Sequence, residues 1–122
     1  KVKNVHFTGH IPEDELISYF RMADIYLHMS EHEGLCAPVP EGFFLNIHVI
    51  AYNEGAVTDT MNGGGILLNK KELLKTPAHI DKIVSDKELR IDILETQKES
   101  LKKYFMNRTG KILLEHLEAL SI

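Results

Sequence analysis

Short, nearly all-apolar runs alternate with amphipathic stretches over the first 70 residues. The runs are rich in β-branched and aromatic residues and are bounded by Gly, Pro, Asn or Asp, which is typical of strands. Strands are predicted at 5–9 (VHFTG), 25–29 (IYLHM), 48–52 (HVIAY) and 65–68 (GILL). Because these runs are apolar rather than alternating, they indicate a mostly parallel sheet that is covered on both faces.

Helical patterns separate the runs and dominate the rest of the chain. Pro12 opens the first helix, three acidic residues follow in its first turn, and Leu16 and Phe20 begin an apolar stripe. Further helices or helical turns are predicted at 40–46, 56–61, 71–75, 78–84, 87–105 and 109–120. The predicted fold class is α/β: a partial Rossmann-like domain with about four mostly parallel strands, flanking helices and a helical tail.

Length and composition narrow the picture. The 122 residues suffice for one small domain, with residues 1–69 as its β/α part and 70–122 as its helical tail. The balance of 43% apolar and 26% charged residues is that of a soluble globular chain. A net charge of −4 argues against a nucleic-acid-binding face. Since the first residue is Lys1 rather than a start methionine, we expect the chain to begin inside a longer protein or to have been processed.

The segment 30–42 (SEHEGLCAPVPEG) is the strongest candidate site. It follows the predicted strand 25–29 and runs into a helix, and ligands of open α/β sheets bind at the carboxyl ends of strands. The start of that helix suits a phosphate. Glu33 and Glu41 flank it, and a carboxylate can accept hydrogen bonds from two sugar hydroxyls. The alternative is that both glutamates only complement the helix dipole.

The histidines and the single cysteine do not form a recognisable metal pattern. His28 and His32 fall on a strand end and a loop rather than on one helix face, so no metal site is predicted, and His28 is expected to be merely packed. No base is identifiable next to Cys36 in the sequence, so Cys36 is expected to be an inert small hydrophobe.

SEHEGLCAPVPEGF resembles the Glu-x7-Glu motif of family 4 retaining glycosyltransferases, group 1 enzymes with the two-Rossmann-domain GT-B architecture. VHFTGHIPEDELISYFRMADIYLHMSEHEG before it and HVIAYNEGAVTDTMNGGGILL after it are similar to the family's neighbouring blocks. The resemblance covers essentially the whole chain. It implies the donor-binding part of a hexosyltransferase that moves a sugar from a UDP- or GDP-linked donor to an acceptor with retention. The alternatives are half of a nucleotide-sugar epimerase, or a non-catalytic nucleotide- or glycan-binding fragment.

The resemblance also implies roles for individual residues. Glu41 would hold the ribose hydroxyls of the donor, and Glu33 would contact the hydroxyls of the transferred sugar as the catalytic, electrostatic group. No metal or other cofactor is needed in that family. The remaining donor-binding residues would be Gly34, Leu35 and Cys36 beside the sugar and phosphates, and Gly9, His10 and Ile11 beside the nucleobase.

The chain departs from the family pattern in three places and lacks parts of it. Gly42, His48 and Asp59 replace the usual alanine, proline and glutamate. Two upstream β-α units with a basic pair for the diphosphate have no counterpart, and no Lys or Arg lies between Lys3 and Arg21. The N-terminal acceptor domain is missing too.

The missing units have consequences for activity and assembly. We expect the isolated chain to be inactive, its sheet to contain a gap, and its exposed sheet edges to permit self-association. The expected location is the cytoplasm, with the inner membrane face as an alternative because related enzymes often build lipid-linked glycans.

Overall fold

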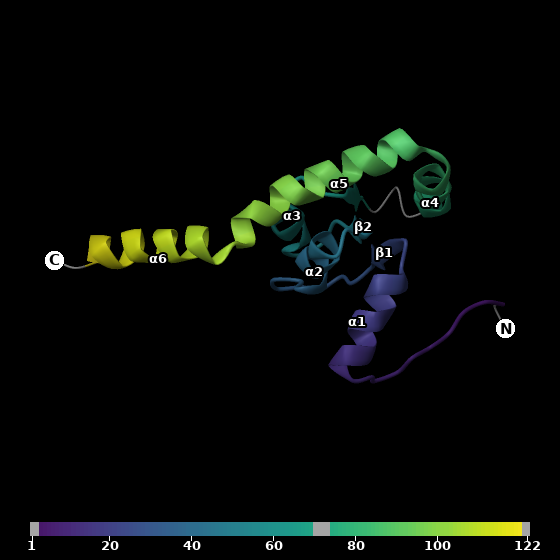
Figure 1. Ribbon diagram of the computed structural model, residues 1–122, viewed down its shortest axis with the longest axis horizontal. Helices are drawn as coiled ribbons and strands as arrows, with labels where there is room; N and C mark the ends of the chain where they lie inside the picture. The colour runs from purple at the N-terminus through teal and green to yellow at the C-terminus, as the bar shows by residue number, and fades with distance from the viewer. Residues whose placement is uncertain (1–2, 70–73, 121–122) are drawn as a thin grey trace.

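The computed structural model describes residues 3–69 and 74–120 and confirms an α/β fold (Figure 1). Three strands form one parallel sheet in the order β1-β2-β3. They are β1 (Ile25–His28), β2 (His48–Tyr52) and β3 (Ile66–Leu68). Three of the four predicted strands are therefore confirmed, and their parallel pairing follows from the helical connections between them.

The helices match the predicted stretches. They are α1 (Glu13–Met22), α2 (Pro38–Phe44), α3 (Val57–Met61), α4 (Thr76–Ser85), α5 (Lys87–Leu101), the 3-10 turn η2 (Lys102–Tyr104) and α6 (Met106–Leu120). Most of the turn predicted at 71–75 lies outside the described residues. In Figure 1, α5 crosses over the sheet, α1 lies on the β1 side, and α6 extends away from the body.

β2 is the centre of the core, because all five of its residues are buried. Val49 and Ala51 face a cluster formed mainly with α2 and α3. Ile50 faces the opposite side, where it packs with Leu68 and with residues of α4 and α5. Helices thus cover both faces of the sheet, as the nearly all-apolar strand pattern predicts.

Gln97 of α5 completes the hydrogen bonding at the start of β2. Its side chain is buried, its Nε2 donates to the Ile47 carbonyl at 2.8 Å, and its Oε1 accepts from the Val49 amide at 2.9 Å. β3 begins only at Ile66, opposite Ile50, so the helix side chain satisfies backbone groups that precede the strand pairing.

Two of the departures from the family pattern lie at packed positions. A Cβ at Gly42 would come within 3.0 Å of the Val49 side chain, so glycine lets α2 approach β2 closely. His48 is buried, with its ring nitrogens 3.1 and 3.3 Å from the carbonyl oxygens of Asp24 and Arg90.

The strand predicted at 5–9 is wrong. The segment has no strand assignment, and Phe7 is 90% exposed. β1 pairs with β2, and no strand of the described residues pairs with the other edge of β1. A β-forming run needs a neighbouring strand for its backbone groups, and this segment finds none. The described sheet therefore has three strands and ends at β1, and the N-terminal segment that was expected to form a fourth strand is unpaired.

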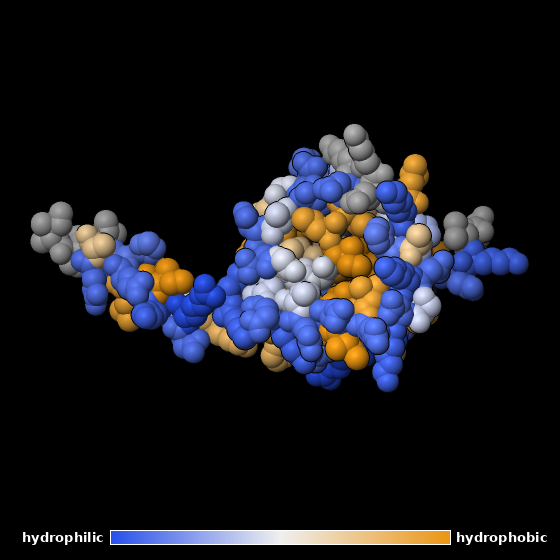
Figure 2. All heavy atoms as spheres, turned by 90° about the horizontal axis from the view of Figure 1, so that it is seen from above, coloured by the Kyte–Doolittle hydropathy of each residue, from blue (hydrophilic) through white to orange (hydrophobic). Residues whose placement is uncertain are grey.

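Exposed apolar residues occur on the body and along α6 (Figure 2). Among the described helices, none has the length and apolar character needed to span a bilayer.

Candidate functional site

The loop between β1 and α2 carries most of the predicted site, and its backbone is held from the β2–α3 side. Thr60 Oγ1 donates to the Leu35 carbonyl at 2.7 Å, and the Ala56 amide donates to the Glu33 carbonyl at 3.3 Å. Gly55 has φ +57°, and a Cβ there would lie 3.1 Å from the backbone carbonyl oxygen of Glu33. The close approach of these two segments requires glycine at this position.

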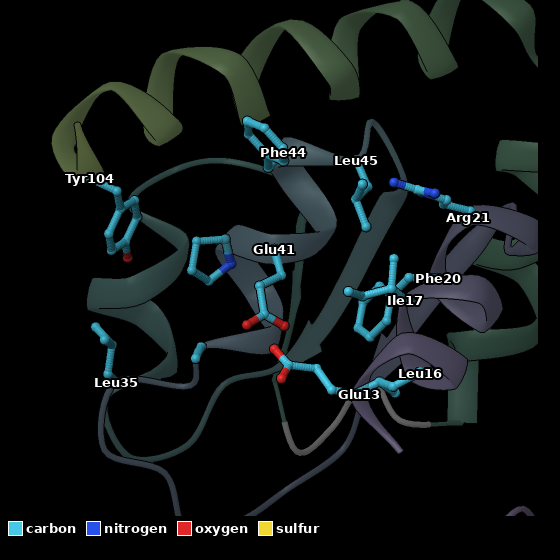
Figure 3. A pocket seen from close by; sticks show the side chains of 12 residues that line it. Glu13, Leu16, Ile17, Phe20, Arg21, Leu35, Glu41, Phe44, Leu45 and Tyr104 are labelled. Atoms are coloured by element: carbon cyan, nitrogen blue, oxygen red, sulfur yellow. The ribbon is translucent and has the colours of Figure 1, made fainter. Parts of the chain in front are cut away.

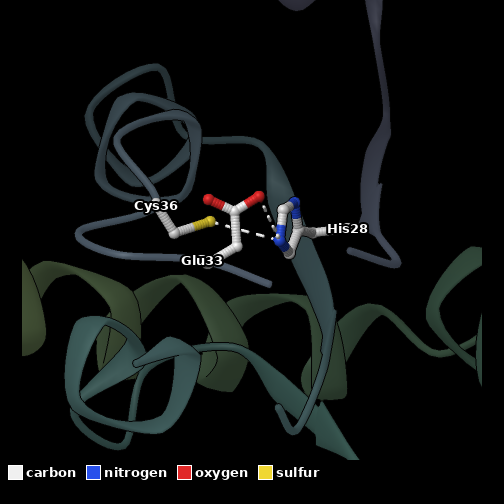
Figure 4. A group of neighbouring side chains, drawn as sticks. All are labelled: His28, Glu33 and Cys36. Atoms are coloured by element: carbon white, nitrogen blue, oxygen red, sulfur yellow. Dashed lines mark hydrogen bonds and ion pairs between the residues drawn. The ribbon is translucent and has the colours of Figure 1, made fainter. Parts of the chain in front are cut away.

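His28 is the meeting point of several polar side chains at the end of β1. Its Nδ1 lies 3.1 Å from the Tyr26 hydroxyl, and its Nε2 lies 3.3 Å from Cys36 Sγ and 3.6 Å from a Glu33 carboxylate oxygen (Figure 4). His28 is 7% exposed and Cys36 is 4% exposed. The expectation that Cys36 has no neighbouring base is therefore wrong, because the fold brings His28 beside it.

This group is largely buried and contains one carboxylate, that of Glu33. Burial, with help from Cys36, Glu33 and Glu41, raises the pKa of Tyr26 to about 12. Burial and the Glu33 carboxylate raise the pKa of the Cys36 thiol, partly offset by a backbone hydrogen bond from Val39. Tyr26 therefore keeps its proton at neutral pH, and both predicted glutamates act electrostatically on this one side chain.

Glu41 lies in the first turn of α2 and lines a cavity of about 530 Å³ between α1 and α2 (Figure 3). The Glu41 carboxylate points toward that of Glu13 on α1. The other lining residues are mainly apolar: Leu16, Ile17, Phe20, Arg21, Leu35, Ala37, Pro40, Phe44, Leu45 and Tyr104. A mainly apolar cavity of this size with a few polar groups is typical of a small-molecule site.

The predicted site residues are only partly brought together. Leu35 lines the same cavity as Glu41, whereas Glu33 and Cys36 turn toward His28. Gly34 is exposed on the connecting loop.

The segment predicted to lie beside the nucleobase is separate from this arrangement. Gly9 and His10 are exposed, and Ile11 is partly buried. None of the three lines the cavity. In the described part of the chain, they form no hydrogen bond or ion pair with Glu33 or Glu41.

Basic groups are sparse around the two glutamates. Arg21 lines the cavity, but within residues 3–69 and 74–120 Glu41 has no ion-pair partner and Glu33 pairs with His28. The Lys103 amine instead donates to the Asp59 carbonyl oxygen, and burial lowers the pKa of Lys103.

The clustering of Tyr26 and His28 with Glu33 and Cys36 was not predicted, although the sequence contains a pattern that indicates part of it. Residues two apart on a strand share a face, so the side chains of Tyr26 and His28 point to the same side of β1. Glu33 and Cys36 follow on the loop from that strand. What the sequence could not give is the path of the loop, which depends on its contacts with Ala56 and Thr60.

Comparison with known families gives a consistent result. No curated protein matches the chain. The family of glycosyl transferases group 1 matches residues 1–100, which include the sheet, the β1–α2 loop and nearly all of α5. The match covers well over half of the sequence, so the chain belongs to the glycosyl transferases group 1 family.

Proposed function

We propose that this chain is the donor-binding part of a retaining hexosyltransferase of the GT-B type that uses a nucleotide sugar. Membership of the group 1 family supports glycosyl transfer in general. The observation that supports a nucleotide-sugar donor site is the position of Glu41. Its side chain lines a cavity of about 530 Å³ next to the loop that contains Glu33. That volume is within the usual range for small-molecule sites.

In this proposal Glu41 accepts hydrogen bonds from the ribose hydroxyls, and Glu33 accepts them from the transferred sugar. Both roles use carboxylate oxygens that lack a Lys or Arg partner in the described residues. Glu33 stabilises developing positive charge at the reacting sugar by its position rather than by forming a covalent bond. The backbone of Gly34, Leu35 and Cys36 lies beside the sugar and phosphates, and the loop of Gly9, His10 and Ile11 lies beside the base.

The test is an amide NMR titration of the chain with UDP and with GDP. We expect shifts at 30–41, at 9–11 and at the residues of α1 that line the cavity, and stronger shifts for one of the two nucleotides. Glu41→Ala should weaken binding roughly tenfold or more, because a hydrogen bond to a charged group is worth about 1.5–3 kcal/mol. Glu31→Ala, at an exposed position of the same loop, is the matched control and should bind normally. Equal losses in both variants, or shifts that leave out both 30–41 and the cavity lining, would contradict the site.

We further propose that the isolated chain binds donor without transferring sugar. The observation that supports this is the shortage of cationic groups for the donor diphosphate. Arg21 is the only Lys or Arg among the described residues that line the cavity, and neither Glu33 nor Glu41 has a Lys or Arg ion-pair partner there. Incubation of the purified chain with UDP- and GDP-hexoses should therefore release no nucleotide above the blank. Release would refute inactivity, and an epimerised donor would favour the epimerase alternative. The enzyme is proposed to work in the cytoplasm or at its membrane face, with its acceptor held by a further domain.

A further inference from the structure

Three side chains of different chemistry converge where β1 meets the following loop. His28 Nε2, a Glu33 carboxylate oxygen and Cys36 Sγ all lie within 4.8 Å of one another (Figure 4). One nitrogen, one oxygen and one sulfur are the three donor atoms that proteins use for zinc.

Two of the three distances between these donor atoms fit a tetrahedral ion. Zinc binds sulfur at about 2.3 Å, and nitrogen or oxygen at about 2.0–2.2 Å, so neighbouring donors in a tetrahedron lie roughly 3.3–3.7 Å apart. The sulfur and nitrogen of Cys36 and His28 are 3.3 Å apart, and the nitrogen and oxygen of His28 and Glu33 are 3.6 Å apart. The third pair, the Cys36 sulfur and the Glu33 oxygen, lies within 4.8 Å, so a movement of about 1 Å or less of the Glu33 side chain would complete the set.

The three residues are held in place by their surroundings. The Tyr26 hydroxyl contacts His28 Nδ1 at 3.1 Å, which leaves Nε2 directed at the cluster, and metal-binding histidines commonly have such a partner. The Val39 amide donates to the Cys36 carbonyl at 3.0 Å, and Cys36 itself has φ +52°. The Glu33 carbonyl accepts from Ala56. This arrangement presents the ligands before any ion arrives.

Charge also favours a cation at this place. Glu33 is partly buried, with 27% of its side chain exposed, and its only ion-pair partner in the described chain is the imidazole of His28. A partly buried carboxylate next to a thiol is stabilised by a bound cation. Metal binding would displace the proton of the Cys36 thiol to solvent and leave a thiolate ligand.

We propose that His28, Glu33 and Cys36 form a binding site for a zinc-class divalent transition metal, with the fourth position open to water. A sulfur and an imidazole ligand select against magnesium and calcium, which prefer oxygen. No metal was predicted from the sequence, because His28 and His32 do not share a helix face; in the fold, His28 lies beside Cys36 instead. The site shares Glu33 and Cys36 with the proposed donor site, so a bound ion would compete with the donor sugar for the Glu33 carboxylate. A metal titration made without any donor tests the metal site separately.

Cobalt(II) is the sharpest probe, because the chain has a single cysteine. Titration of the reduced, metal-free chain should give one equivalent of bound cobalt, a thiolate-to-cobalt charge-transfer band, and strong visible bands typical of tetrahedral geometry. Zinc should then displace the cobalt. Cys36→Ser should abolish the charge-transfer band, and His28→Asn and Glu33→Gln should each weaken zinc binding by about tenfold or more.

His32→Asn and Glu31→Gln are the matched controls, because both residues are exposed on the same loop and outside the cluster. They should bind cobalt and zinc like the unaltered chain. Circular dichroism of each variant without metal checks that the fold is retained. Zinc protection of the cysteine of the unaltered chain against a thiol reagent needs no variant at all. Absence of the charge-transfer band in the unaltered chain, or equal loss of binding in the His32→Asn control, would overturn the proposal.

Discussion

Two sequence runs of the same length, both predicted to be strands, differ in the structure. HVIAY at 48–52 becomes β2 and is buried at every residue, whereas VHFTG at 5–9 lies unpaired, with Phe7 90% exposed. Both contain the β-branched and aromatic residues that favour strands. The difference is in their neighbours: β2 has a strand on each side and helices on both faces.

Residues with high strand propensity thus form a strand only where a neighbouring strand can pair with them. Around β2, even the unpaired backbone groups before the β3 pairing are satisfied, by the Gln97 amide of α5. In the described residues, no side chain of another element hydrogen-bonds the backbone of 5–9 in this way. The self-contained part of the molecule is therefore the three-stranded sheet with α2 to α5, and the site loop belongs to that part.

The largest test of this contrast compares Ile50→Ala with Phe7→Ala. Ile50 is 0% exposed between β2 and the helices α4 and α5, so its truncation leaves a cavity and should cost about 2–5 kcal/mol in the free energy of unfolding. Phe7→Ala should change it by less than about 0.5 kcal/mol. Urea unfolding followed by circular dichroism measures both. A comparable loss for Phe7→Ala would show that 5–9 is packed in solution, against a second chain for instance.

Gln97→Leu is expected to have the next largest effect. It keeps the approximate size of the side chain but removes both hydrogen bonds, which leaves the Val49 amide and the Ile47 carbonyl buried without partners. The cost should be about 2–3 kcal/mol. Lys98→Leu on the exposed face of the same helix is the control and should be nearly neutral. A neutral Gln97→Leu would mean that water reaches the start of β2.

Glycines with positive φ in the two regions give a third comparison. Gly65 precedes β3 at φ +73°, and a Cβ there would lie 2.7 Å from the Val49 carbonyl oxygen, so Gly65→Ala should cost about 2 kcal/mol. Gly9 has φ +64° but open space around it, and its unpacked segment can relax. Gly9→Ala should therefore shift the urea midpoint little. Equal midpoints for the two variants would contradict the packing around β3.

Sequence patterns predicted most of the fold because most of it follows local rules. The strands at 25–29, 48–52 and 65–68 and the helices between and after them appear within a few residues of their predicted bounds. The prediction of a strand at 5–9 was wrong because a strand needs a partner strand from elsewhere in the chain. The local sequence VHFTG does not indicate whether such a partner exists.

The candidate site was predictable in its position but not in its internal contacts. The strand-to-helix segment with Glu33 and Glu41 is where the sequence places it. Which way each carboxylate turns depends on the path of the loop: Glu33 faces His28, and Glu41 faces the cavity with Glu13. The path of the loop in turn depends on contacts with the segment around Ala56, which is distant along the chain.

The smallest effect is expected from removal of α6. This helix extends away from the body and has exposed apolar residues, among them Ile112, Leu113 and Leu114 (Figures 1 and 2). Helices of this length are marginal in water without packing partners, so the body gains little stability from α6. A chain that ends at Phe105 should unfold at the same urea concentration, with a change below about 0.5 kcal/mol. A larger loss would place α6 against the body in solution, and the self-contained unit would then have to include it.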